Sequence, residues 1–289
     1  MLLSVYIISY NHAKFIRKCI ESVFNCKDIE YDVTVIDNAS SDGSQAIINE
    51  LSLNYCFKKV LNKENDGLPK TLNKILFSSN CEFICFLAAD DYVAFDRFKT
   101  QVAFLQNNPE YYGCSGSQVK VNENDECLPR YKQKNIVDIG KKVDASNIFD
   151  TSNIIYSPTA IYRKDVLVEL GGYDERILIE DLYIYYKAAS CGYKFYIIPK
   201  LFTYYRNHDG NTHTKFKWMH EQKLKILNEH KGSIHYKKLK KLVLLEGFYS
   251  LSLNNKKDAL RLLPAVIIYV NSLFLYAGLF KLFFYWRSE

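Results

Sequence analysis

The residues with the clearest chemical potential are two adjacent aspartates, Asp90 and Asp91, at the end of an apolar run. The run, CEFICFLAADD, is typical of a buried strand. Paired carboxylates at the carboxyl end of a strand can share a divalent cation such as Mg²⁺ or Mn²⁺ with a phosphate-rich ligand. The same pair could belong to a polar turn that caps a helix, because Asp favours that position. By themselves, the aspartates predict a metal site and a capped turn equally well.

A regular alternation of strands and helices precedes these aspartates. Runs rich in β-branched and aromatic residues predict strands at 2–8, 31–36, 56–61 and 82–87. Apolar side chains at helical spacing predict helices at 12–24, 44–53 and 68–77. This order predicts an α/β fold, in which helices cover both faces of a parallel sheet. Polar residues after the strands should meet at one rim and form a crevice, with contributions from Ser9, Tyr10, Asn11, Asp37 and Asp90.

The rest of the chain predicts a less regular half of the sheet and a helical appendage. Strands are expected near 118–121, 159–162 and 194–198, with a helix at 180–190, and they should make the sheet mixed. The appendage starts with a basic stretch, 215–241, that holds nine lysines and two glutamates. An uncharged stretch, 262–280, follows. We therefore expect one domain over 1–213 and a basic, then apolar, helical appendage over 214–289.

The uncharged stretch is long enough to cross a membrane, but its sequence is interrupted. Pro264 lies at its start, and Asn271 and Ser272 lie in its middle. These residues favour a segment that packs on the domain or lies at a membrane interface over one that spans the bilayer. The lysines before it would suit an anionic membrane surface, although they could also form a solvated helix face.

Composition and short motifs exclude several classes of protein. A chain of 289 residues with 48% hydrophobic and 24% charged residues is globular, and its net charge of +6 is too small to indicate nucleic acid as a partner. The sequence has no G-x-G-x-x-G after a strand and no Walker-type phosphate loop. Eight scattered cysteines without a C-x-x-C pair, and a start without a basic signal-peptide region, favour a reduced cytoplasmic location.

Six segments, in order, resemble the motifs of the family 2 inverting glycosyltransferases with the GT-A fold. They are SVYIISYNH, VIDNASSDGS, NDGLPKTLNKIL, FLAADD, GGYDE with EDLYIYYKAASCGY, and YRNHDGNTH. One such motif is weak, but six in this order are specific. The resemblance runs from about 4 to 213 and implies a Rossmann-like mixed sheet flanked by helices. It also implies transfer of a sugar from a nucleotide-sugar donor, most readily a UDP-sugar, to a glycan or lipid-linked acceptor.

The resemblance assigns roles to individual residues. It implies that the donor nucleotide is held by Ser9, Tyr10, Asn11, Asp37, Asp42, Lys70, Asp90 and Arg206. It implies Mn²⁺ or Mg²⁺ as cofactor, with Asp90, Asp91 and His208 as ligands. Asp181, with Glu180 in reserve, would be the base that accepts the proton of the acceptor hydroxyl.

Each of these roles has a simpler alternative. Lys70 could be an exposed helical lysine, and His208 an ordinary surface histidine. Glu180 and Asp181 could open a helix, where the helix dipole favours negative charge.

One departure from the family pattern bears on activity. Ala88 stands where the motif F-L-D-x-D-D has its first aspartate. The missing carboxylate leaves open a nucleotide-sugar-binding protein with impaired catalysis. A nucleotidyltransferase, which also uses aspartates at strand ends, is disfavoured because no glycine-rich basic loop follows the first strand. The resemblance places the enzyme in cell-surface polysaccharide, lipopolysaccharide or O-antigen synthesis, in the cytoplasm or peripherally on the inner face of the cell membrane.

Overall fold

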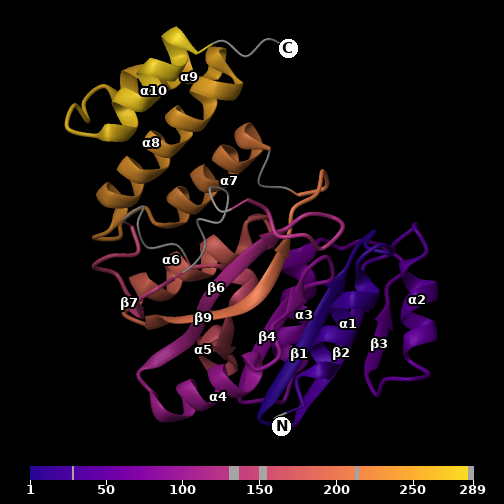
Figure 1. Cartoon of the computed structure of the whole chain (residues 1–289). Coiled ribbons are helices and arrows are strands. Elements are labelled where there is room, and N and C mark those ends of the chain that lie inside the picture. The colour runs from indigo at the N-terminus through magenta and orange to yellow at the C-terminus, as the bar shows by residue number, and fades with distance from the viewer. Residues whose placement is uncertain (28, 130–136, 150–154, 212–214, 286–289) are drawn as a thin grey trace.

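The computed structural model describes residues 1–27, 29–129, 137–149, 155–211 and 215–285 (Figure 1). Within these residues, the strands are β1 (Leu3–Ser9), β2 (Tyr31–Asp37), β3 (Lys58–Leu61), β4 (Phe83–Ala88), β5 (Tyr92–Val93), β6 (Tyr111–Val121), β7 (Lys141–Val143), β8 (Ile161–Arg163) and β9 (Lys194–Arg206). They form one mixed sheet in the order β3-β2-β1-β4-β8-β6-β9-β5, with β7 beside β9. The predicted α/β fold class is confirmed.

The helices of the described residues fall into two sets. Those that accompany the sheet are α1 (Ile16–Asn25), α2 (Ser44–Leu51), α3 (Leu68–Ser78), α4 (Arg97–Asn107), α5 (Lys164–Glu169) and α6 (Glu180–Ser190). Those that follow it are α7 (Phe216–Glu229), α8 (Tyr236–Asn254), α9 (Lys256–Val266) and α10 (Leu273–Phe284). In Figure 1, α8, α9 and α10 stand above the sheet, at the far end of the molecule from the N-terminus.

The first four strands build the parallel half of the sheet as predicted. β1 lies between β2 and β4 and is parallel to both. Their apolar side chains, such as Val5, Ile7 and Val35, are fully buried between the covering helices. In this register Ser9 lies opposite Asp37, and Ile8 lies opposite Ala88. The carboxyl ends of the three strands therefore share one rim, and the polar residues after them are neighbours.

The second half of the sheet is longer and more irregular than the sequence predicts. β6 and β9 pair in parallel over most of their lengths, with bulges, whereas the expected strands covered only 118–121 and 194–198. Small residues weaken the strand signal of β6. They are needed there, because a Cβ at Gly116 would lie 2.4 Å from the Phe202 ring and one at Gly113 would lie 2.6 Å from the Phe195 ring. The aromatic rings of β9 therefore pack directly against the backbone of β6 at these two glycines.

The strand expected at 159–162 starts later. Ser157–Thr159 form a 3-10 turn, and β8 begins at Ile161. The Thr159 hydroxyl accepts a hydrogen bond from the Gly116 backbone N–H at 2.9 Å. That bond joins the turn to β6 and holds Thr159 outside the ladder of the sheet.

The C-terminal helices divide between two cores. α7 and the first half of α8 belong to the core of the sheet domain through Ile226, Leu227 and Leu239. The second half of α8 packs with α9 and α10 around a separate cluster that includes Leu244, Phe248 and Leu275. The predicted domain boundary between 213 and 214 lies outside the described residues. By its packing, the basic stretch joins the main domain and the separate layer starts within α8.

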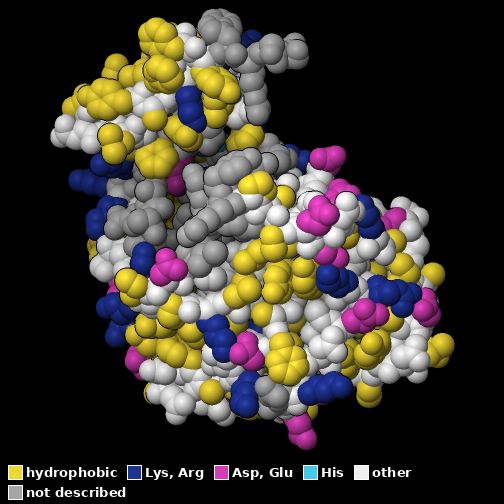
Figure 2. All heavy atoms as spheres, in the orientation of Figure 1, with side chains coloured by type: hydrophobic (Ala, Val, Ile, Leu, Met, Phe, Trp, Pro, Cys, Tyr) yellow, Lys and Arg dark blue, Asp and Glu magenta, His cyan; other side chains and the backbone are white. Residues whose placement is uncertain are grey.

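The uncharged stretch is two helices rather than one. α9 ends at Val266 and α10 starts at Leu273, with Asn271 and Ser272 in the turn between them. Among the described residues, no helix is both long enough and apolar enough to cross a membrane. Apolar side chains nevertheless gather on the surface of α9 and α10, at the top of Figure 2.

Candidate active site

The loop after β1 is fastened to the loop after β2. Asn11 has a left-handed backbone, with φ of 58°, so the chain turns sharply at the rim. The backbone N–H groups of 11–13 donate, in order, to Ser40 Oγ at 2.7 Å, Ser44 Oγ at 3.1 Å and Asp42 Oδ2 at 2.8 Å. Burial raises the pKa of Asp42, but hydrogen bonds from Ser44 and from the backbone outweigh it and lower that pKa. Asp42 thus holds the two loops together, whatever it contributes to nucleotide binding.

Asp37 and Ser9 lie side by side at the ends of β2 and β1. The Asp37 carboxylate is fully buried and accepts hydrogen bonds from the Ser40 N–H at 2.9 Å and from Gln45 at 2.8 Å. The Ser9 hydroxyl is also fully buried, and it has no partner among the described residues. A buried hydroxyl without a partner is costly, so it is suited to a bound ligand. Tyr10 is half exposed beside it.

Lys70 lies in the first turn of α3. Its ammonium group donates to Asp66 at 2.9 Å, and Lys74 binds the same carboxylate. The two lysines lower the pKa of Asp66 to about 2. The structure therefore shows Lys70 in a surface ion pair, which agrees with the simpler alternative, and leaves its phosphate contact a prediction.

Asp90 and two histidines form the centre of the site. Asp90 Oδ2 lies 3.0 Å from His208 Nε2 and 3.9 Å from His12 Nε2. One ligand atom from each residue lies within 4.8 Å of the other two. Asp90 Oδ1 and His12 Nδ1 are buried without a partner among the described residues. A divalent cation would satisfy such a set of carboxylate and imidazole atoms, so these residues fit a metal ion.

Charge and burial act in opposite directions at this centre. Burial by itself raises the pKa of Asp90, but the hydrogen bond from His208 and the charges of both histidines outweigh it and lower that pKa. Burial lowers the pKa of His12, against the opposing effect of Asp90. A carboxylate and a neutral imidazole are the ligating forms of these groups.

The sequence analysis did not identify His12. It follows the end of β1 by three positions, in the motif SYNH, and the logic that places Ser9 and Tyr10 at the rim extends to it. Its closeness to Asp90, 78 positions later, follows from the parallel pairing of β1 with β4. The neighbouring strands bring the ends of two distant segments together.

Among the described residues, the cluster of Asp90 and the two histidines does not include the Asp91 carboxylate. This carboxylate is almost fully buried and accepts a hydrogen bond from the Arg206 backbone N–H at 2.9 Å. Burial, and then the negative charge of Asp90, raise its pKa well above the usual range. The structure thus brings Asp90 and His208 together and directs Asp91 to the backbone of β9.

The Arg206 guanidinium is enclosed by protein. It donates to the Asp90 carbonyl oxygen and to the Asp125 carboxylate. Its central carbon lies 4.5 Å from the centre of the Phe15 ring and 5.4 Å from that of Tyr92. Only 1% of the residue is exposed, so Arg206 supports the backbone of the aspartate turn from within. Its contact with the donor diphosphate stays a prediction.

Glu180 and Asp181 open α6, as the helix-start alternative requires. Burial, and then the charge of Asp181, raise the pKa of Glu180 to about 8. Burial, together with the charges of Asp91, Asp90 and Asp181, also raises the pKa of Tyr205. Tyr205 therefore lies within electrostatic reach of Asp90, Asp91 and Asp181.

A link between two distant motifs positions α6. Asn73 of α3 donates to the Tyr173 carbonyl oxygen and accepts from the Tyr173 N–H, both at 2.8 Å. Gly172 has φ of 69°, and a Cβ there would lie 2.6 Å from Asn73 Oδ1. The asparagine and the glycine thus join the segment NDGLPKTLNKIL to the segment GGYDE, and together they fix the loop that leads into α6.

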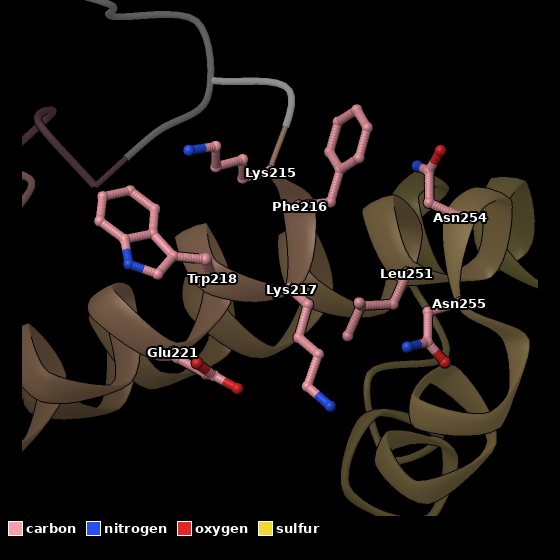
Figure 3. Close-up of a pocket in the computed structure, with 8 residues that line it drawn as sticks. All are labelled: Lys215, Phe216, Lys217, Trp218, Glu221, Leu251, Asn254 and Asn255. Carbon is pink, nitrogen blue, oxygen red and sulfur yellow. The ribbon is translucent and has the colours of Figure 1, made fainter. Parts of the chain in front are cut away.

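A separate open cavity of about 840 Å³ lies between the start of α7 and the end of α8. Figure 3 shows its lining residues, Lys215, Phe216, Lys217, Trp218, Glu221, Leu251, Asn254 and Asn255. None of the predicted site residues lines it. The cavity therefore does not belong to the Asp90 centre.

A mixed sheet with polar residues at its parallel rim, and a carboxylate–histidine centre beside them, is the arrangement expected of a GT-A glycosyltransferase. The chain belongs to glycosyl transferase family 2, whose family model matches residues 4–171. The resemblance drawn from the six motifs is thereby confirmed.

Curated relatives agree with this membership. An uncharacterized glycosyltransferase of Haemophilus influenzae is 27% identical over 73% of this chain and 76% of its own length. A dTDP-rhamnosyl transferase of Shigella flexneri, RfbG, is 25% identical over 70% of this chain and 72% of its own length. The poly-beta-1,6-N-acetyl-D-glucosamine synthase of Staphylococcus epidermidis is 22% identical over 68% of this chain, which spans only 48% of that protein.

Solved structures show the same fold. S. aureus TarS in complex with UDP-GlcNAc superposes with a TM-score of 0.70 at 21% identity, over 92% of this chain and 81% of that one. The mannosyltransferase PcManGT from Pyrobaculum calidifontis, in complex with GDP-Man and Mn²⁺, gives a TM-score of 0.62 at 16% identity, over 98% and 87% of the two chains.

Proposed function

We propose that this protein is a metal-dependent inverting glycosyltransferase that moves a sugar from a nucleotide-sugar donor, most readily a UDP-sugar, to a glycan or lipid-linked acceptor. The observation that carries the proposal is the position of Asp90. Its Oδ2 lies beside two histidines, and its Oδ1 is buried without a partner among the described residues. Asp37 and the Ser9 hydroxyl lie at the same rim. Family membership and the TarS likeness support the class of reaction.

The donor would lie along this rim. Asp37 and Ser9 are suited to hydrogen bonds with the nucleoside, and Tyr10 offers an exposed ring beside them. Asp90 and His208 would hold Mn²⁺ or Mg²⁺, which acts as a Lewis acid on the leaving diphosphate. Asp42 keeps the first two loops at the spacing that this binding needs.

The acceptor would enter from the side of α6. Its hydroxyl oxygen forms a bond to the anomeric carbon while the bond from that carbon to the diphosphate oxygen breaks, which inverts the configuration. Asp181 accepts the hydroxyl proton in this proposal. Glu180 is the less suitable base, because a pKa of about 8 keeps it protonated at neutral pH.

Release of nucleoside diphosphate in the presence of Mn²⁺ tests the function, with Asp181→Asn as the variant. We expect Asp181→Asn to lower kcat by about 10²- to 10⁴-fold while donor binding is kept. Tight donor binding without any turnover by the unmodified protein would favour the impaired-binder alternative that Ala88 raises. Release of pyrophosphate from a nucleoside triphosphate and a sugar 1-phosphate, without release of nucleoside diphosphate from the nucleotide sugar, would favour a nucleotidyltransferase.

A lipid-linked acceptor would place the enzyme at a membrane surface, and the layer formed by α9 and α10 offers a suitable contact. Several of its large apolar side chains are more than half exposed: Ile268 at 70%, Leu273 at 86%, Phe280 at 62% and Phe284 at 74%. Exposed apolar surface of this extent marks an interaction site. We call these four residues the apolar tip; it lies at the top of Figure 2.

Basic residues border the layer that carries the apolar tip. Lys241 Nζ lies 5.8 Å from the ring centre of Tyr269, in the turn between α9 and α10. Lys281 Nζ lies 3.4 Å from the ring centre of Tyr249. Apolar side chains that enter the acyl region, with lysines at the level of the headgroups, are typical of a peripheral contact with an anionic leaflet.

Binding to vesicles that contain phosphatidylglycerol tests this contact. We expect the double variant Leu273→Ser/Phe284→Ser to bind about tenfold more weakly, because two apolar side chains no longer enter the bilayer. Leu53→Ser is the matched control, since Leu53 is equally exposed, at 84%, on the sheet domain. Unchanged vesicle binding by the double variant would contradict the contact. The contact would also be contradicted if the unmodified protein does not bind vesicles but forms a dimer that the same substitutions dissociate.

A further inference from the structure

Ala88 leaves the aspartate turn one carboxylate short of the family motif. The side chain at this position, at the end of β4, is a methyl group and cannot hold a cation. A cation bound by Asp90 and His208 would then have two protein ligands. The structure supplies another group beside Asp90.

We infer that His12 is a third protein ligand of the cation and takes over the function of the carboxylate missing at position 88. The inference rests on the proposed nucleotide-sugar site, because the diphosphate completes the coordination. His12 Nε2 lies 3.9 Å from Asp90 Oδ2, and the atoms of all three ligands lie within 4.8 Å of one another. With metal–ligand bonds of about 2.0–2.2 Å, two ligand atoms of one cation lie at most about 4.4 Å apart. The distances of 3.0 Å and 3.9 Å from Asp90 Oδ2 to the two histidines fall within this limit.

The surroundings of His12 hold it at this place. Its backbone N–H donates to Ser44 Oγ at 3.1 Å, and its carbonyl oxygen accepts from the N–H groups of Phe15 and Ile16, each at 2.9 Å. The chain at His12 is thus fastened both to the loop after β2 and to the start of α1. The ring sits largely covered, with 20% of the side chain exposed.

The hydrogen bonds of the two rings differ. His208 Nδ1 accepts from the Gly210 N–H at 3.1 Å, so its proton lies on Nε2 and points to Asp90. A cation at His208 Nε2 displaces that proton and the Gly210 bond. His12 Nδ1 has no partner among the described residues, and its Nε2 stands too far from Asp90 for a direct hydrogen bond. His12 can therefore bind a cation without breaking any hydrogen bond of its ring.

Two imidazole nitrogens and one carboxylate change the preference for the metal. Mg²⁺ favours oxygen ligands and retains its waters, whereas Mn²⁺, Co²⁺ and Zn²⁺ accept imidazole readily. The site should therefore select a transition-metal ion of the Mn²⁺ type over Mg²⁺. A carboxylate at position 88 in place of His12 would reduce that selectivity.

Pulsed electron paramagnetic resonance of Mn²⁺ bound to the full chain with UDP counts the coordinated nitrogens directly. We expect two histidine nitrogens in the unmodified protein and one in each of His12→Ala and His208→Ala. Calorimetric titration with Mn²⁺ should show about 10- to 100-fold weaker binding for His12→Ala and a much smaller change with Mg²⁺. His235→Ala, a histidine at the start of α8, is the matched control.

A second variant separates loss of a ligand from loss of the fold. Ala88→Asp in the His12→Ala background should restore tight metal binding and raise the affinity for Mg²⁺ relative to Mn²⁺. Two nitrogen couplings and full Mn²⁺ affinity in His12→Ala would overturn the inference, even if the enzyme transfers sugar. A protein that shows both nitrogens but neither binds nucleotide sugar nor releases nucleoside diphosphate would instead refute the proposed function.

Discussion

The parallel half of the sheet and the layer of α9 and α10 use apolar side chains in opposite ways. In the sheet, Val5, Ile7 and Val35 are fully buried, and polar groups collect where the strands end. In α10, Leu275 and Leu282 are buried, whereas side chains on its other face are open to solvent. The sheet completes its own core and presents a polar site. The helical layer leaves the apolar side chains of its other face exposed, which is typical of an interaction surface.

Replacement of Asp90 should give the largest effect, and it should affect only the site on the sheet and not the helical layer. We expect Asp90→Asn to lower kcat by about 10³-fold or more and to abolish tight Mn²⁺ binding, because the charged ligand at the centre is lost. Vesicle binding should be unchanged. Asp66→Asn, a surface carboxylate paired with lysines, is the control for enzyme assays. Full activity of Asp90→Asn would contradict the assignment of the centre.

Substitutions at Phe248 and Leu273 compare the buried and exposed faces of the helical layer. Phe248 of α8 is fully buried, and a Cβ at Gly278 of α10 would lie 2.6 Å from its ring. Phe248→Ala should destabilise the layer by about 3–5 kcal/mol, measured by urea unfolding or by proteolysis within α8–α10. Leu273→Ser should change stability by less than about 0.5 kcal/mol, since this side chain is 86% exposed. Equal losses in the two variants would show that Leu273 is part of the core.

Glu180 gives a smaller effect that depends on pH. Its pKa is raised to about 8 in the folded protein from 4.5, so the unfolded chain loses this proton first and stability falls as pH rises from about 4.5 to about 8. Glu180→Gln has no proton to lose. Its free energy of unfolding, relative to that of the unmodified protein, should therefore be several kcal/mol higher at pH 8.5 than at pH 4. Parallel pH profiles of the two proteins would rule out the raised pKa.

The smallest effect is expected at Lys70. Because the Lys70 ammonium group forms an ion pair with Asp66 at the surface, Lys70→Ala should change the KM for the donor by less than about threefold. Lys74→Ala, which removes the other lysine on Asp66, is the matched control. A tenfold or greater rise in KM for Lys70→Ala alone would show that Lys70 does meet the diphosphate.

Local patterns were sufficient for the parallel half of the fold and for its rim. Strands and helices alternate there at regular spacing, and parallel strands necessarily align their carboxyl ends, so Ser9, Asp37 and Asp90 could be placed together. The same reasoning failed for β6, where glycine and serine weaken the strand signal. Those small residues are required by the rings of β9, a contact between segments about 80 positions apart that no local pattern contains.

By itself, the sequence determined the family and the α/β class, because these depend on motif order and strand periodicity. Through the family resemblance it also predicted Asp90 and His208 as ligands of one cation. Only the tertiary structure decided which groups meet. It joined His12 to Asp90, turned Asp91 to the backbone of β9, and enclosed the Arg206 guanidinium between Phe15 and Tyr92. The physical reason is that the direction of a side chain at a strand end is set by the packing and hydrogen bonds of distant segments, which spacing along the chain does not specify.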